Sequence, residues 1–215
     1  MITLNARNLS LDDVHRFLNF QKQYNSSFTP LLSLETLTEI DQQELEQIRN
    51  DFDNYLTAGK VSEGQIKLLI GPLLRLAGFY RSPIQITLEE NIADIDIEDE
   101  GTKITGRMDI LSVNKVQKIT ANMYFWLLVI ETKNSLADVL VGLPQLLTYA
   151  LKSLEHQSSV WGLVTNGARY QFVYLQPGSP STYQLMPLLN LMESEPSTQI
   201  LQVFKAICKL QNTLL

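Results

Sequence analysis

Residues 124–133 read YFWLLVIETK, a segment that contains the longest strongly apolar run of the chain, residues 124–130. It is apolar on both sides of an extended chain until its end, which is typical of a central strand with both faces covered. Leu127, Val129, Glu131 and Lys133 alternate along it, so we expect all four on one face. A carboxylate and an ammonium group thus end an apolar strand, where charges are unfavourable unless they are paired or bind a metal.

A second carboxylate, Asp109, lies 22 residues before Glu131, between the apolar residues Met108 and Ile110. A hairpin through residues 114–122 would bring Asp109 beside Glu131. Two carboxylates without a nearby histidine or thiol suit a hard cation, Mg²⁺ or Mn²⁺. A lysine beside such a site can orient a water and offset developing negative charge. The pattern therefore predicts metal-assisted hydrolysis of a phosphodiester.

The flanking residues predict helices on both sides of a sheet. Residues 60–215 are expected to form one α/β (α+β) domain with a mixed central sheet, and residues 1–59 an N-terminal helical arm packed on it. A change of alternation predicts a turn or bulge near Glu90 and Asn91. Hydrophobic periodicity predicts helices at 41–57, 62–77, 143–155 and 197–213, and strands within 83–113 and at 159–165 and 169–175.

Three polar residues on the predicted helices lie within reach of this strand end. Gln145 and Tyr149 are four residues apart and share a helix face that follows Lys133. Glu63, in the first turn of the 62–77 helix, would supply a third carboxylate.

These residues carry a resemblance to a known family. Asp109, then Glu131-Thr132-Lys133, then Gln145-xxx-Tyr149 resemble the PD-(D/E)xK nuclease superfamily. Residues 62–78 together with WGLVTNG at 161–167 resemble the N-terminal nuclease domain of type I restriction enzyme motor subunits, and its stand-alone relatives. The resemblance covers residues 60–176. It implies a restriction-endonuclease-like fold and a Mg²⁺- or Mn²⁺-dependent nuclease that hydrolyses DNA.

The resemblance also implies roles for individual residues. Asp109 and Glu131 would be metal ligands, and Lys133 would position the water and stabilise charge. Glu63 would assist from its helix, and Gln145 would support the site or contact the nucleic acid. Tyr149 would support the glutamine helix.

Each of these residues also has an ordinary structural interpretation. Glu131 and Lys133 could form a surface ion pair, which contributes little to stability. An acid such as Glu63 is favoured in a first helical turn by the helix dipole, and Gln145 could be a solvated helix residue. The alternative function is a non-catalytic nucleic-acid- or protein-binding module on the same fold, or a scaffold with no nucleic-acid role.

The composition is that of a globular protein, with 45% hydrophobic and 19% charged residues in 215. The net charge of −6 has the wrong sign for binding DNA through bulk electrostatics. Arg107, Lys115 and Lys118 are candidates for phosphate contacts. Within the acidic run from Glu89 to Glu100, the acids at 94, 96 and 98 alternate with Ile95 and Ile97 and are expected on a solvated strand face.

The single cysteine, Cys208, excludes an intrachain disulfide, and two histidines argue against a histidine-rich metal centre. We expect a cytoplasmic protein, because the N-terminus does not resemble a secretory signal and no apolar run is long enough to cross a bilayer. A two-fold homodimer would suit cleavage of both DNA strands, although no residue specifies one.

Overall fold

The computed structural model describes residues 2–24, 27–91, 95–97, 102–120 and 123–210. The helices are α1 (Leu11–Phe17), α2 (Glu39–Ala58), α3 (Glu63–Ala77), α4 (Leu143–Leu154) and α5 (Ser194–Lys209), with 3₁₀ turns η1 (Ala6–Asn8) and η2 (Val139–Gly142). The strands are β1 (Ile2–Asn5), β2 (Phe20–Gln23), β3 (Ile84–Asn91), β4 (Ile95–Ile97), β5 (Thr102–Thr105), β6 (Arg107–Thr120), β7 (Met123–Thr132), β8 (Val160–Thr165), β9 (Arg169–Gln176), β10 (Ser181–Leu185) and β11 (Leu189–Asn190).

An eight-stranded mixed sheet forms the centre of the molecule. Its strands follow the order β2-β10-β9-β8-β7-β6-β3, with β11 paired to β9. The β7–β8 and β10–β2 pairs are parallel, and the other pairs in this sheet are antiparallel. The expected mixed sheet flanked by helices is confirmed, and β7 occupies the central position predicted for residues 124–133.

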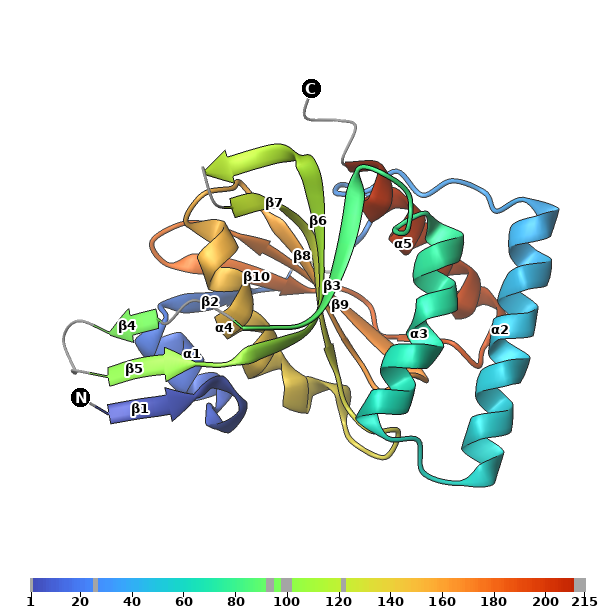
Figure 1. The fold of residues 1–215 in the computed structure, drawn as a ribbon, viewed down its shortest axis with the longest axis horizontal. Coiled ribbons are helices and arrows are strands. Elements are labelled where there is room, and N and C mark those ends of the chain that lie inside the picture. The colour runs from blue at the N-terminus through green and yellow to red at the C-terminus, as the bar shows by residue number, and fades with distance from the viewer. Residues whose placement is uncertain (1, 25–26, 92–94, 98–101, 121–122, 211–215) are drawn as a thin grey trace.

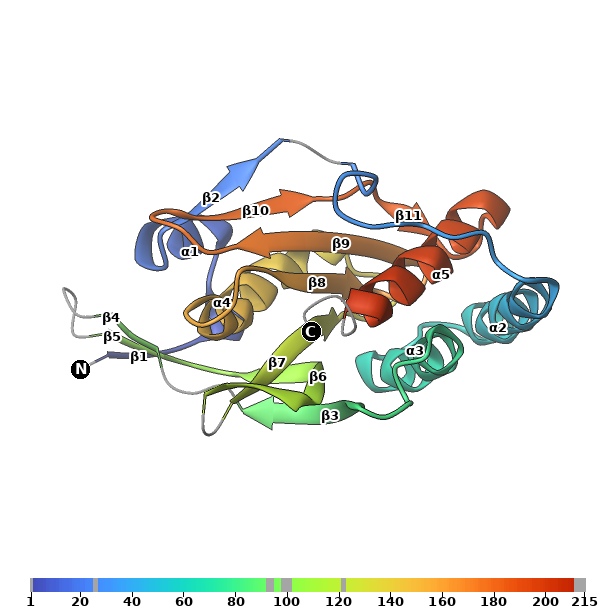
Figure 2. The same ribbon diagram turned by 90° about the horizontal axis from the view of Figure 1, so that it is seen from above.

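Helices cover both faces of this sheet. Helices α2, α3 and α5 gather on one side and α1 and α4 on the other (Figures 1 and 2). Each side encloses its own apolar cluster, represented by Phe52, Ile70 and Phe204 on the first and by Val14 and Leu146 on the second. None of the described helices has the length and apolarity needed to cross a membrane.

The starts of the two helices that frame the first side follow from local sequence. Ser62 and Thr38 cap α3 and α2, and each accepts a hydrogen bond from the backbone N–H three residues later. Gly78 ends α3 in a left-handed conformation, with φ of 104°, which glycine adopts without strain.

The N-terminal segment expected to be a helical arm contains α1 and α2 but also two strands. Strand β1 pairs in parallel with β5 in a small sheet of order β1-β5-β4, which projects beside α1 (Figure 1). Strand β2 pairs in parallel with β10 at the edge of the large sheet. Four residues are too few for alternation to be read locally, so these strands carry no signal until their distant partners are known.

Two details of strand geometry differ from expectation. The register between β3 and β6 has the same offset before and after Glu89, so it does not slip near Glu90; Glu89 itself adopts a positive φ of 57°. The register between β6 and β7 shifts beside Leu127. Leu127 consequently packs with the α3 side rather than on the face of Val129.

Candidate active site

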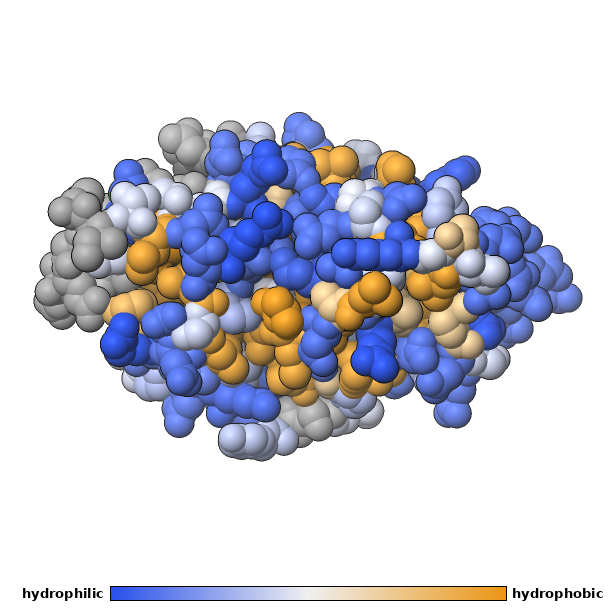
Figure 3. All heavy atoms as spheres, turned by 90° about the horizontal axis from the view of Figure 1, so that it is seen from below, coloured by the Kyte–Doolittle hydropathy of each residue, from blue (hydrophilic) through white to orange (hydrophobic). Residues whose placement is uncertain are grey.

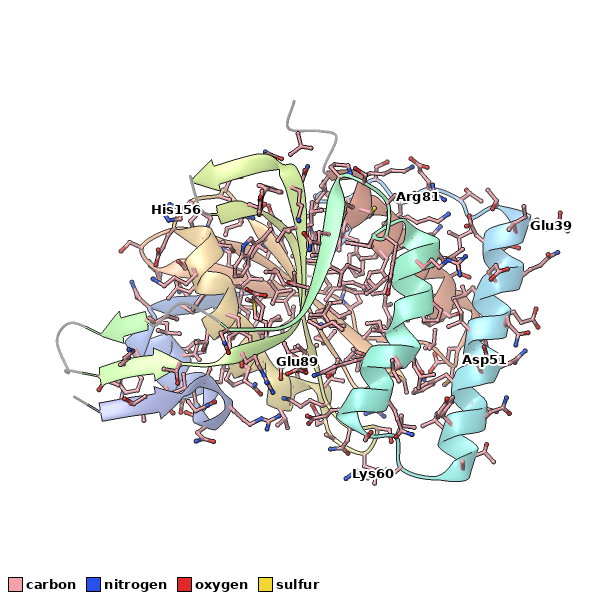
Figure 4. The ribbon with its side chains drawn as sticks, viewed as in Figure 1. Glu39, Asp51, Lys60, Arg81, Glu89 and His156 are labelled. Carbon is pink, nitrogen blue, oxygen red and sulfur yellow. The ribbon has the colours of Figure 1, made fainter. Side chains whose placement is uncertain are left out.

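A pocket of about 540 Å³ opens where β3, β5, β6, α3 and α4 meet. Asp109, Gln145 and Tyr149 line it together with Glu63 and Gly106. Glu89 lies toward the end of β3, between the small sheet and α3 (Figure 4). The predicted residues of three separate elements therefore converge on one hollow.

Lys133 lies at the centre of a buried hydrogen-bonded chain. Its Nζ donates to Glu131 Oε1 at 2.6 Å and to Gln145 Oε1 at 2.7 Å. Gln145 Nε2 donates in turn to the hydroxyl of Tyr149 at 2.9 Å. The side chains of Lys133 and Glu131 are only 7% and 1% exposed, so the surface ion-pair interpretation does not hold. Gln145 is likewise buried rather than solvated.

Helix α4 approaches this chain closely because of a glycine at its start. A Cβ at Gly142 would lie 3.1 Å from both Glu131 Cγ and Lys133 Cε. Pro144 occupies the first turn, where its missing N–H is not needed and its fixed φ favours the helix. The sequence GLPQ at residues 142–145 thus places the Gln145 amide within hydrogen-bond distance of Lys133.

The carboxyl group of Glu131 is in an unfavourable place for a negative charge. Burial raises its pKa from the ordinary 4.5 to about 7, and the nearby charge of Asp109 adds to this, while Lys133 acts in the opposite direction. Its second oxygen, Oε2, is buried and has no hydrogen-bond partner among the described residues. Burial also raises the pKa of Tyr149 to about 12, so this hydroxyl stays neutral.

Asp109 is held through both oxygens. Its Oδ2 accepts hydrogen bonds from the backbone N–H and the hydroxyl of Thr132, each at 2.7 Å. Its Oδ1 forms an ion pair with Lys67 Nζ at 2.7 Å, and Lys67 also pairs with Glu89. Burial works against the charge on Lys67, but the hydrogen bonds to these two carboxylates raise its pKa overall. Lys67 is therefore a permanent cation at this site.

The remaining candidates are distributed between the rim and distant surface. Glu63 reaches the pocket and pairs with Arg7 at 3.2 Å, and Arg107 pairs with Glu89 at 2.7 Å. Lys115 is exposed and lies six residues beyond Asp109 along β6, about 20 Å away at the rise of a strand, so it does not belong to this pocket.

Part of the predicted surface lies outside what the structure describes. The backbone of Lys118 is in β6, but its side chain is outside the described part. Within the predicted acidic face, residues 94 and 98–100 are likewise outside the described residues, as is the side chain of Asp96.

Four residues of the site were not predicted. Lys67 pairs with Asp109, and Glu89 pairs with Lys67. Thr132 donates a hydrogen bond to Asp109, and Arg7, from the N-terminal segment, pairs with Glu63 at the rim. Lys67 could have been found, because it lies one helical turn after Glu63 on the same helix. Thr132 lies between two selected residues, whereas Glu89 and Arg7 reach the site only through sheet pairing.

The donor set fits a hard divalent cation. Mg²⁺ is commonly bound by one or two carboxylates, with waters and substrate phosphates completing its shell. Glu131 offers a buried carboxylate oxygen without a partner, and Asp109 lies close enough to influence its pKa. No group of three or more His, Cys, Asp and Glu residues suited to a metal was found within the described residues. These two carboxylates would therefore act with water and phosphate oxygens rather than in a complete protein cage.

The surroundings of the pocket are mixed in character. The face seen from below is largely polar, with apolar side chains gathered near its middle (Figure 3). Leu136, Leu140 and Val141 are exposed in the connection between β7 and α4. A larger hollow of about 1200 Å³ lies between α2, α3 and α5, and none of the predicted site residues lines it.

No protein-family model matches the chain, and no curated protein sequence matches it either.

Proposed function

We propose that the protein is a divalent-metal-dependent nuclease of the PD-(D/E)xK type that hydrolyses phosphodiester bonds in DNA. One observation carries the proposal: an acid–lysine pair, Glu131 and Lys133, is fully buried at a strand end beside a second carboxylate, Asp109. Burying two charges costs their hydration, and here one oxygen of Glu131 has no hydrogen bond among the described residues to offset that cost. The proposal is supported by the pocket beside this pair, because Asp109 and Gln145, which holds Lys133, both line it.

Each residue has a defined task in this proposal. A bound Mg²⁺ or Mn²⁺ would polarise the phosphate and lower the pKa of a water. Asp109 and Glu131 would hold the cation. Lys133 lies behind the residues that line the pocket and uses two of its three N–H donors on Glu131 and Gln145; the third would serve a phosphate oxygen or the attacking water. Gln145 keeps the ammonium group in place, and Tyr149 fixes which end of the amide faces it.

The test is cleavage of supercoiled and linear duplex DNA by the purified protein with Mg²⁺ or Mn²⁺. Lys133→Met should lower the rate by about 10²- to 10³-fold, the usual effect of removing one charge-stabilising donor. Lys152→Met is the matched control, because Lys152 is a surface lysine paired with Glu155. Cleavage that survives EDTA, or full activity of a folded Lys133→Met variant, would contradict the mechanism.

The rival function is a non-catalytic binding module, and a specific observation favours it. Both oxygens of Asp109 already have partners, Thr132 and Lys67. Saturable binding of DNA or of Mn²⁺ without hydrolysis of duplex DNA, single-stranded DNA or RNA would support this rival.

A further inference from the structure

The ion pair between Lys67 and Asp109 lies at the point where a divalent cation would have to bind. Asp109 Oδ2 is fixed to the sheet by two hydrogen bonds from Thr132. Its other oxygen, Oδ1, is the one that faces Lys67 at 2.7 Å. A cation that binds Asp109 through Oδ1 therefore takes the position of the ammonium group. A divalent ion and an ammonium group within about 4 Å of each other also repel strongly.

Lys67 has a second anionic partner beside the first. Glu89 lies between Leu88 and Glu90, which pair with Ile110 and Met108 on either side of Asp109, and its carboxylate pairs with both Lys67 and Arg107. The Lys67 side chain is 17% exposed and that of Glu89 is 39% exposed, so the Glu89 side of the pair faces the opening. The flexible four-carbon stem of lysine allows its ammonium group to leave Asp109 and remain with Glu89.

We propose that Lys67 is a displaceable counter-ion of Asp109, which neutralises this carboxylate until a divalent cation takes its place and which then turns to Glu89 and a substrate phosphate. The proposal rests on the proposed function and adds a regulatory element to that site. Metal and nucleic acid would then bind cooperatively. The metal takes Asp109 from Lys67, and a phosphate of the nucleic acid gives Lys67 a new anionic partner. A phosphodiester substrate supplies the anion that accepts the freed ammonium group.

The experiment is calorimetric titration of Mn²⁺ into the full chain without nucleic acid. Lys67→Met should bind Mn²⁺ about tenfold or more tightly than the wild type, because a competing cation is gone. Lys152→Met, the control lysine, should match the wild type, and Asp109→Asn should abolish binding. Glu89→Gln should bind more weakly, because Lys67 then has Asp109 as its only carboxylate partner among the described residues.

The double variant Lys67→Met/Glu89→Gln separates this explanation from one in which Glu89 is itself a metal ligand. Tight binding in the double variant supports the counter-ion, whereas weak binding overturns it. Circular dichroism checks folding, and Lys67→Gln, which keeps an N–H donor toward Asp109 without the charge, replaces Lys67→Met if that variant is unfolded.

The outcomes also separate this proposal from the proposed function. Binding that requires Asp109 but is unchanged or weaker when Lys67 is neutralised overturns the counter-ion and leaves the metal site in place. Binding that does not require Asp109, or no binding even with a short duplex present, overturns both.

Discussion

Replacing Glu131 by glutamine should change the pH dependence of folding in a calculable way. The folded-state pKa of this carboxyl is raised from the ordinary 4.5 to about 7 by burial and by Asp109. Below pH 4.5 the group is protonated in both the folded and unfolded chains and has no effect on the pH dependence. Between pH 4.5 and about pH 7 the unfolded chain releases the proton and the folded chain keeps it, so the free energy of unfolding falls as the pH rises.

The size of the effect follows from the shift. Each pKa unit corresponds to about 1.4 kcal/mol, so the wild type loses about 3 kcal/mol across the whole window, and the loss is complete above pH 7. Glutamine does not titrate. The unfolding free energy of Glu131→Gln minus that of the wild type should therefore rise by about 2 kcal/mol between pH 5.5 and pH 8, the part of the window away from the pI near 5.0.

Urea unfolding of both proteins at half-unit pH steps, with EDTA present, measures this difference. Glu46→Gln, which removes an exposed carboxylate on α2, is the control for the loss of one surface charge. A flat difference for Glu131→Gln would refute the reasoning. Such a flat difference is the result expected if Lys133 keeps Glu131 ionised, because the carboxyl is then charged in both the folded and unfolded chains throughout this range.

Three further substitutions test the local geometry. Tyr149→Phe removes the acceptor of the Gln145 amide N–H; we expect a loss of about 1–3 kcal/mol in urea unfolding for an unsatisfied buried donor, and a lower cleavage rate. Thr132→Val removes the hydroxyl bond to Asp109 and keeps the backbone one, so thermal unfolding should show a loss of about 1–2 kcal/mol, and no loss would mean that the backbone bond suffices. Gly142→Ala places a Cβ 2.6 Å from a methyl carbon of β8; we expect a loss of about 1–3 kcal/mol and slower cleavage, whereas a wild-type melting temperature would contradict the close packing of α4.

The long elements were predictable because each carries its own repeated pattern. Helix α3 has an apolar stripe with a capping serine before it and a glycine after it, and β7 has an unbroken apolar run. Strands β1, β2, β10 and β11 have two to five residues each and depend on partners elsewhere in the chain. Leu127 illustrates the same limit within a predicted strand, because a register shift reverses its face.

The site was predictable to the extent that its residues share one strand, one hairpin or one helix face. Glu131 and Lys133 follow from alternation, and Gln145 and Tyr149 from helical spacing. Asp109 follows from a hairpin. Lys67 and Glu89 come from a helix and an edge strand whose positions over Asp109 are set by tertiary packing. Local pattern therefore identified the groups that would perform chemistry, and missed those that compensate their charge.

This compensation leaves the proposed nuclease without a charge of its own to attract a polyanion. Three cationic and three acidic side chains line the pocket, and the buried pair beneath them adds one of each sign. They are Arg7, Lys67 and Arg107 with Glu63, Glu89 and Asp109, above Lys133 and Glu131. These formal charges cancel, so neither the pocket nor the whole chain, at −6, attracts phosphate through excess positive charge. A bound divalent cation would supply that excess positive charge and would free Lys67 to contact a phosphate of the DNA backbone. Affinity for DNA would therefore depend on the metal even without cleavage of a phosphodiester bond.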